Sequence, residues 1–205
     1  MIKQWAKIIL VSSCLFTSST AFAENMLKNG SFDDPENPLA GWVSDYAFTK
    51  NNQYMDNVKK VSVVAAEQDR YLVARIESMT DAGAKLETEP IPFEEGYRYA
   101  GSLDFKGPDY RIYFAGYKWK PGVKPHDNPT LAELRQVYKS HAATGNAPGW
   151  KKVNLEIPGT EITKGAMAYL KQIEYITLFV YVTRTSYIDE VSVTRKRDPS
   201  VKFSK

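Results

Sequence analysis

Short runs of aromatic and β-branched residues recur along this chain, and Gly, Pro, Asn and Asp separate them. Such spacing is typical of the many short strands of a sandwich or barrel, because turn residues interrupt each run after a few positions. The runs predict strands near residues 26–32, 42–49, 58–66, 70–78, 84–91, 97–106, 110–119, 150–157, 173–183 and 186–195. We therefore expect an all-β fold, a two-sheet antiparallel β-sandwich.

One segment departs from this pattern and predicts a short helical insertion near residues 130–141. Thr130 can cap the amides that follow it, and Glu133 lies three residues later, where its side chain can reach back. Three apolar side chains would then share one helix face, namely Leu131, Leu134 and Tyr138. Together with its flanking loops the insertion spans about residues 120–148, and connections of that length usually carry function or cover another surface.

The first 23 residues are expected to be a cleavable signal peptide. Lys3 and Lys7 flank the start of an apolar run at 8–16, and the small-residue site at 21–23 follows; this order is that of secretory signals. The run is shorter than the roughly 20 apolar residues that a membrane span requires. In a second interpretation, residues 11–14 resemble a bacterial lipobox and would leave a lipid anchor on Cys14. Either way, residues 24–205 are expected to form one exported domain, periplasmic or extracellular.

Charge and cysteine content narrow the partners of residues 24–205. Cys14 is the only cysteine of the sequence, so cleavage would leave a domain without disulfides or thiol chemistry. Cleavage also removes Lys3 and Lys7 from the 27 basic residues, which leaves 25 against 24 acidic ones. A nearly neutral domain with interspersed charges lacks the clustered basic face typical of nucleic-acid binding. We expect no nucleic-acid partner, no membrane span, and a monomer.

Alternation along the predicted strands 97–106 and 110–119 separates a core face from a second face rich in rings and charges. Flat aromatic rings stack on the C–H faces of sugars, and charged side chains can form bidentate hydrogen bonds with hydroxyl groups. This pattern therefore predicts a glycan-binding patch. Its candidate residues are Trp119, Tyr117, Tyr113, Arg111, Arg98 and Asp104. The same rings could instead form a second small core under the insertion, with the charges in cross-strand pairs.

Several stretches, in a fixed order along the chain, identify a family resemblance. They are Leu27-Lys28-Asn29-Gly30-Ser31-Phe32-Asp33 with Gly41-Trp42, Glu89-Pro90-Ile91 with Gly96-Tyr97-Arg98-Tyr99, Gly149-Trp150-Lys151-Lys152-Val153 with Ile157-Pro158, and Tyr187-Ile188-Asp189-Glu190-Val191-Ser192-Val193. The chain resembles carbohydrate-binding modules of the CenC type over nearly all of residues 24–205, except the insertion. The resemblance implies a galactose-binding-like jelly roll of two antiparallel sheets, with the first and last strands close together in space. Together with the signal peptide and the face rich in rings and charges, it predicts a secreted, non-catalytic protein that binds polysaccharide or another glycan.

The resemblance also implies a structural calcium ion, with Asp33 and Asp189 as the matching ligand positions. Calcium binds hard oxygen ligands such as carboxylates and loop carbonyls. Asp33 stands where the family usually has Glu, so its reach is shorter by one methylene. In the alternative interpretation, Asp189 accepts hydrogen bonds from the N-terminal turn and no metal is bound.

Two other functions remain open. The sandwich could be a structural or adhesive cell-surface protein whose insertion contacts a partner. It could also be a polysaccharide lyase, because residues 113–117 resemble a motif of jelly-roll alginate lyases in which a tyrosine acts as acid and base. However, Glu174 stands where that family has histidine. His126 and His141 are the only histidines, and no triad, zinc or phosphate-loop motif accompanies them. We therefore predict that the protein is not an enzyme.

Overall fold

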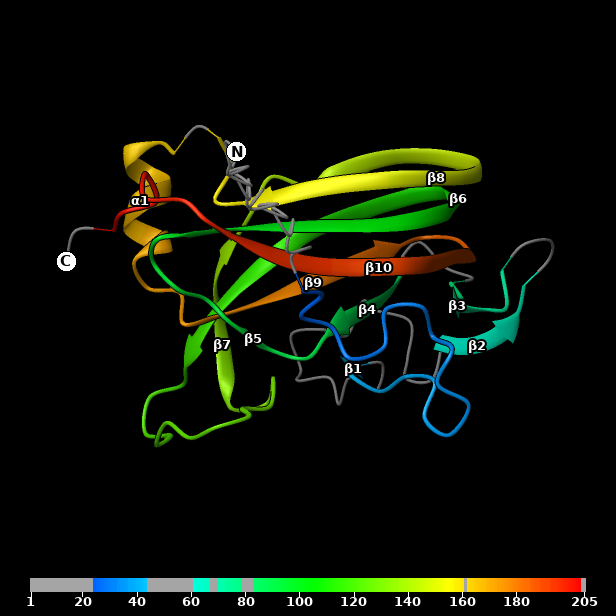
Figure 1. Ribbon diagram of the computed structural model, residues 1–205, viewed down its shortest axis with the longest axis horizontal. Coiled ribbons are helices and arrows are strands. Elements are labelled where there is room, and N and C mark those ends of the chain that lie inside the picture. Colours follow the sequence, from blue (N-terminus) through cyan, green and yellow to red (C-terminus); the bar gives the residue numbers. More distant parts are fainter. Residues whose placement is uncertain (1–23, 44–60, 67–69, 79–82, 161, 204–205) are drawn as a thin grey trace, which may run out of the picture.

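The strands of this protein form an antiparallel sheet that curls into a two-layer sandwich (Figure 1). The computed structural model describes residues 24–43, 61–66, 70–78, 83–160 and 162–203, so the signal peptide and Cys14 lie outside the described residues. The elements are β1 (Trp42–Val43), β2 (Val61–Ala65), β3 (Leu72–Ile76), β4 (Ala84–Thr88), β5 (Ile91–Pro92), β6 (Tyr97–Trp119), β7 (Leu134–Lys139), β8 (Ala143–Ile157), α1 (Lys164–Leu170), β9 (Tyr175–Val182) and β10 (Ser186–Arg197).

The long strand β6 belongs to both layers. Its pairing with β10 ends at Lys106, and its pairing with β9 begins at Arg111. Residues 97–106 therefore lie between β8 and β10 in a first sheet that continues to β3 and β2. Residues 111–119 lie in a second sheet that continues through β9 to β4 and β1, and their other side pairs first with the start of β8 and then with β7. The sequence predicted these two segments as separate strands; the structure makes them one strand that passes from one sheet to the other.

The hydrophobic core lies between the two sheets, as the alternation in the sequence indicated. Leu103 and Phe105 from the first half of β6 are fully buried, and so are Ile112 and Phe114 from the second half. They pack in one cluster with residues of β3, β4, β8, β9 and β10. Burying each such side chain contributes about 1.5–3 kcal/mol, so this shared core holds the two layers together.

The prediction of an all-β fold with one short helix is confirmed, but the helix near 130–141 is misplaced. That segment contains a turn and then β7, which pairs with the end of β6 through Trp119 with Leu134 and Ala115 with Lys139. The unpaired edge of β6 offers backbone partners to this segment, and such pairing overrides a weak local preference for helix. Within the described residues the α-helix is α1, at Lys164–Leu170.

Helix α1 was not predicted from the sequence, although it has a local cause. The hydroxyl of Thr163 accepts a hydrogen bond from the backbone N–H of Ala166 at 3.1 Å, which caps the first turn. Leu170 is the buried residue of this seven-residue helix. Within the part of the chain that the structure describes, no helix is long and apolar enough to cross a membrane.

The N-terminal segment runs beside the last strand, as the resemblance implied. The N–H of Met26 donates to the carbonyl of Val193 at 2.8 Å, and the N–H of Val191 donates to the carbonyl of Gly30 at 2.9 Å. A Cβ atom on Gly30 would lie 1.8 Å from the carbonyl oxygen of Val191, so only glycine permits this approach. The predicted strand at 26–32 is thus a loop that closes on β10.

Candidate functional site

The six predicted ligand-binding residues lie on two opposite surfaces, which corrects the expectation of one patch. Arg98 and Asp104 come from the first half of β6 and lie on the outer face of the first sheet, whereas Arg111 comes from the second half. Because β6 passes between the layers, its two outward-facing sets point to opposite sides of the sandwich. Four of the candidates stay together on the outer face of the second sheet: Arg111, Tyr113, Tyr117 and Trp119.

Arg98 is engaged by the C-terminal segment. Its Nε donates to Asp198 at 3.0 Å and its Nη1 donates to the carbonyl of Pro158 at 2.6 Å. Hydrogen bonds from Ser200 and from Arg98 lower the pKa of the Asp198 carboxyl. These contacts tie the end of the chain to β6 and leave Arg98 bound within the protein.

Asp104 belongs to a partly buried ion triad centred on Arg70. The Arg70 guanidinium donates to Asp189 at 2.7 Å and to Asp104 at 2.5 Å. Burial alone would lower the pKa of Arg70, but the two carboxylates outweigh it and raise that pKa. Asp189 is only 3% exposed, and a buried charge requires such a partner.

The residues around Asp189 are compatible with a bound cation. Its Oδ1 atom is buried and has no hydrogen-bond partner among the described residues. Burial raises the pKa of the Asp189 carboxyl, and the nearby charge of Asp33 raises it further. The described residues contain no cluster of three or more His, Cys, Asp or Glu side chains, so a calcium ion here would need loop carbonyls beside these two carboxylates.

The floor of the second sheet's outer face is a set of packed aromatic rings over a buried carboxylate. Tyr113 and Phe179 stack with ring centres 4.6 Å apart, an arrangement that contributes about 0.5–1.5 kcal/mol. Tyr117 donates its hydroxyl hydrogen bond to Glu87, which also accepts from Thr177 at 2.5 Å. Glu87 is 1% exposed, and Tyr113 and Tyr117 are 7% and 8% exposed. Burial and then the charge of Glu87 raise the pKa of both tyrosines.

Cationic side chains lie over these rings. The Lys139 ammonium is 4.1 Å from the centre of the Tyr113 ring, and the Arg111 guanidinium is 6.0 Å from that of Tyr181. Burial lowers the pKa of Lys139, and the positive charge of Arg111 lowers it further. Lys139 and Arg111 are both exposed. The Lys85 ammonium is 5.4 Å from the centre of the Phe179 ring. We refer to this surface as the ring–cation face, which comprises Lys85, Glu87, Arg111, Tyr113, Tyr117, Trp119, Lys139, Phe179 and Tyr181.

Trp119 lies at one end of the ring–cation face, where the loop before β7 reaches it. Its ring is half-buried, 5.0 Å from the ring of His126 and edge-on to Tyr175 at 5.8 Å. Leu131 and Leu134 pack against the same cluster. Part of the segment 120–148, which the sequence predicted as an insertion, therefore adjoins this end of the ring–cation face. Arg111 and Lys139 remain accessible farther along the same face.

Several members of the ring–cation face escaped the sequence reading. Phe179 and Tyr181 alternate with core residues in β9, a signal visible in the sequence, but their position beside Arg111 and Tyr113 depends on the pairing of β9 with β6. Glu87 is an acid within a predicted strand, which could have marked it as a buried polar site. Glu174, which stands where the alginate lyases have histidine, contacts Tyr117 only through the backbone. Its N–H donates to the carbonyl of Tyr117 at 2.9 Å, and its side chain is exposed.

Comparisons with known proteins connect this chain to solved structures alone. No known protein family matches the sequence, and neither does any curated protein. Three solved structures are similar over most of the chain. The CBM22-1 xylan-binding domain of Xyn10C from Paenibacillus barcinonensis is 13% identical, with a TM-score of 0.50, over 85% of this chain and 96% of that one.

The other two structures are larger. The CBM22-1–CBM22-2 tandem domain of the same Xyn10C is 12% identical, with a TM-score of 0.51, over 81% of this chain and 49% of that one. The CBM22-1–GH10 modules of Xyn10B from Clostridium thermocellum, complexed with xylohexaose, are 13% identical, with a TM-score of 0.48, over 85% of this chain and 28% of that one. The chain thus spans less than half the length of these two matches.

Identities of this size show a shared fold. The strand arrangement of the chain is that of the jelly-roll carbohydrate-binding modules, so the predicted jelly roll is confirmed. The CenC type remains a prediction.

Proposed function

We propose that this protein is an exported, non-catalytic carbohydrate-binding protein that binds polysaccharide through its ring–cation face. One observation carries the proposal: two exposed cations, Arg111 and Lys139, lie over a floor of stacked rings, and a half-buried indole, Trp119, lies at one end of the same sheet face. Aromatic surface provides contact area for the C–H faces of a sugar, and charged groups orient its hydroxyl groups. This combination suits a ligand that is both apolar on one face and rich in hydroxyl groups.

The accessible members of the face would contact the glycan, and the buried ones would hold them in place. Trp119 supplies a ring, and Arg111 and Lys139 supply donors that the chain does not use in ion pairs among the described residues. Tyr113 and Tyr117 form the floor beneath them. The likeness in fold to a xylan-binding domain supports the ligand class, while the sugar itself is open.

A non-catalytic role agrees with the chemistry of the floor. Burial and the charge of Glu87 raise the pKa of Tyr117, so its phenol stays protonated at ordinary pH. That hydroxyl also lies beneath the surface and donates to Glu87, so it is not presented to a polymer as the base of a lyase must be. Export of the protein rests on residues 1–23, and the mass of the protein recovered outside the cytoplasm would reveal removal of that segment.

The deciding experiment is a screen of immobilised glycans followed by calorimetry on any ligand found. We expect at least tenfold weaker binding for Trp119→Ala and for Arg111→Gln, because each removes a group that faces the ligand. Tyr169→Ala and Arg197→Gln are matched controls, since both residues are exposed and lie outside the ring–cation face; they should bind as the unaltered protein does. Absence of binding to every glycan, or equal binding by all four variants, would refute the proposal.

We also propose that Asp33 and Asp189 hold a structural calcium ion. The support is the unpartnered Oδ1 of Asp189 and the proximity of Asp33. Bound calcium would neutralise the two carboxylates and fix the N-terminal loop against β10.

A further inference from the structure

A hollow of about 450 Å³ lies on the outer face of the first sheet, away from the ring–cation face. Its volume falls in the range of about 300–1,000 Å³ that small-molecule sites occupy. Two aromatic rings and two cations contribute to its wall, together with small and apolar residues. The lining residues are Val64, Ala65, Ala66, Val73, Arg75, Lys106, Pro148, Gly149, Trp150 and Tyr187.

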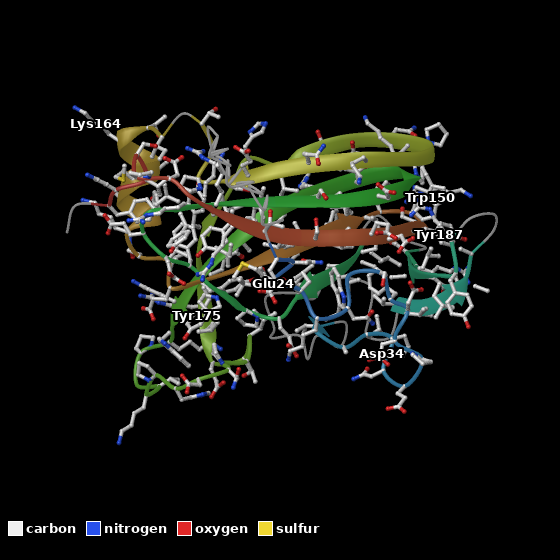
Figure 2. All side chains as sticks on the ribbon, viewed as in Figure 1. Glu24, Asp34, Trp150, Lys164, Tyr175 and Tyr187 are labelled. Atoms are coloured by element: carbon white, nitrogen blue, oxygen red, sulfur yellow. The ribbon has the colours of Figure 1, made fainter. Side chains whose placement is uncertain are left out.

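Strand register brings the polar and aromatic groups of this hollow into one row. Tyr187 of β10 is the partner of Lys106 in β6 on one side and of Arg75 in β3 on the other. Trp150 of β8 precedes Lys151, the partner of Phe105, and thus lies beside Lys106. Figure 2 shows Trp150 and Tyr187 at the same end of the molecule, with Tyr175, which contacts Trp119, toward the other end.

The Trp150 ring is held in place from one side. The guanidinium of Arg70 lies 4.1 Å from the ring centre, and Arg70 is itself fixed by its hydrogen bonds to Asp104 and Asp189. A ring fixed before a ligand arrives loses little conformational freedom on binding. The partly buried ion triad therefore positions an aromatic surface at the edge of the hollow.

The hollow is lined by positive charge, and one of its hydrogen-bond donors has no partner within the described part of the chain. Arg75 pairs with Glu77 through Nη1 at 2.8 Å, but its Nε is buried and has no hydrogen-bond partner among the described residues. The Lys106 ammonium lies 5.9 Å from the centre of the Tyr187 ring. No described residue that lines the hollow is acidic. The Arg75 side chain as a whole is 38% exposed, so its guanidinium is open to an acceptor oxygen of a ligand.

We propose that this hollow binds a pyranose that carries a carboxylate, that is, a uronic acid unit, at a second site distinct from the ring–cation face. The sugar ring lies against Trp150 and Tyr187. Its carboxylate pairs with the accessible part of the Arg75 guanidinium and with the ammonium of Lys106. The rings provide contact area for a sugar, and the cations select the acidic form over a neutral one of the same shape.

The indole N–H resonances of the protein, assigned by replacing Trp119 and Trp150 in turn with Phe, provide a test that separates the two sites. We expect trigalacturonate to shift the Trp150 resonance in a saturable way, and galactotriose to bind there at least tenfold more weakly. Arg75→Gln should weaken trigalacturonate binding at least tenfold. Lys164→Gln and Tyr169→Leu, which change two exposed residues of α1, should leave trigalacturonate binding unchanged.

The proposal and the function proposed above can fail separately. A Trp150 shift that persists in Trp119→Ala supports an independent second site, even if the ring–cation face binds nothing. A shift confined to Trp119, equal binding of the acidic and neutral trisaccharides at Trp150, or full binding by Arg75→Gln would overturn the second site. Tyr187→Leu provides a further variant if Arg75→Gln folds poorly, and it too should weaken binding at Trp150.

Discussion

The carboxylate of Glu133 accepts hydrogen bonds from both the backbone N–H and the hydroxyl of Thr130, at 2.9 and 2.8 Å. His126 lies on the other oxygen of the same carboxylate, 2.9 Å away, and its ring contacts Trp119. A single exposed carboxylate therefore organises the loop that adjoins one end of the ring–cation face.

These contacts predict an unusually acidic Glu133. The N–H of Thr130 is the largest cause, followed by His126 and the Thr130 hydroxyl, and together they lower the pKa of Glu133 to about 2. A lowered pKa in the folded state means that this contribution to stability is present above the ordinary pKa and is lost as the pH falls toward 2. Carboxyl carbon chemical shifts measured against pH should show this value, and it should rise in His126→Gln and Thr130→Val. A value near 4 in the unaltered protein would contradict the geometry.

Removal of Arg70 should be among the most destabilising single changes at a polar residue. Arg70→Met leaves Asp104 and Asp189 without their shared cation in a poorly solvated site, which costs about 3–5 kcal/mol of the free energy of unfolding. Urea denaturation in the presence of a chelator measures the loss. Arg195→Met is the control, because the pair of Arg195 with Glu94 is solvent-exposed and is worth less than about 1 kcal/mol. Similar losses in the two variants would show that the triad adds nothing.

A methyl group at Gly30 should disrupt the contact between the N-terminal loop and β10. The added Cβ would meet the carbonyl oxygen of Val191, and backbone atoms cannot yield as a flexible side chain does. We expect Gly30→Ala to lower the free energy of unfolding by about 1–3 kcal/mol or more. Gly159→Ala serves as the comparison, because nothing lies within 4 Å of the equivalent Cβ. If Gly30→Ala unfolds at the same temperature as Gly159→Ala, the close approach is incorrect.

Calcium should stabilise the protein if Asp33 and Asp189 bind it. A ligand that binds only the folded state raises the melting temperature by mass action, so adding calcium after chelation should increase Tm. Asp33→Asn and Asp189→Asn should abolish the increase. Asp34→Asn, a neighbouring change of the same kind, should retain it. An unchanged Tm for the unaltered protein on addition of calcium would exclude the metal.

The sequence revealed the two faces of each sheet but not the relation between the sheets. Alternation along 97–106 and 110–119 correctly separated Phe105 and Phe114 from Asp104 and Tyr113, because residue spacing within a strand determines the face. The separation of Asp104 from Tyr113 across the sandwich depends on where β6 changes sheets, and no local pattern marks that position. For the same reason Glu87, which reaches Tyr117 through strand pairing, was not predicted.

The misplaced helix shows how one local signal can serve two structures. The contact between Thr130 and Glu133 expected from a capping box is present, yet it closes a turn and not a helix. Beyond it, Leu134 and Lys139 pair with β6, and that partner is distant in the sequence. The hydroxyl of Thr163 performs the same capping with Ala166, and there a helix follows.

Because β6 is an inner strand of both layers, the sandwich has no line along which it can be divided. Unfolding of either layer removes β6 from the other layer as well, so heat or denaturant should unfold both layers in a single cooperative transition. A fragment that ended near residue 108 would keep neither surface. The ring–cation face and the hollow beside Trp150, although turned to opposite sides, therefore persist or vanish as one.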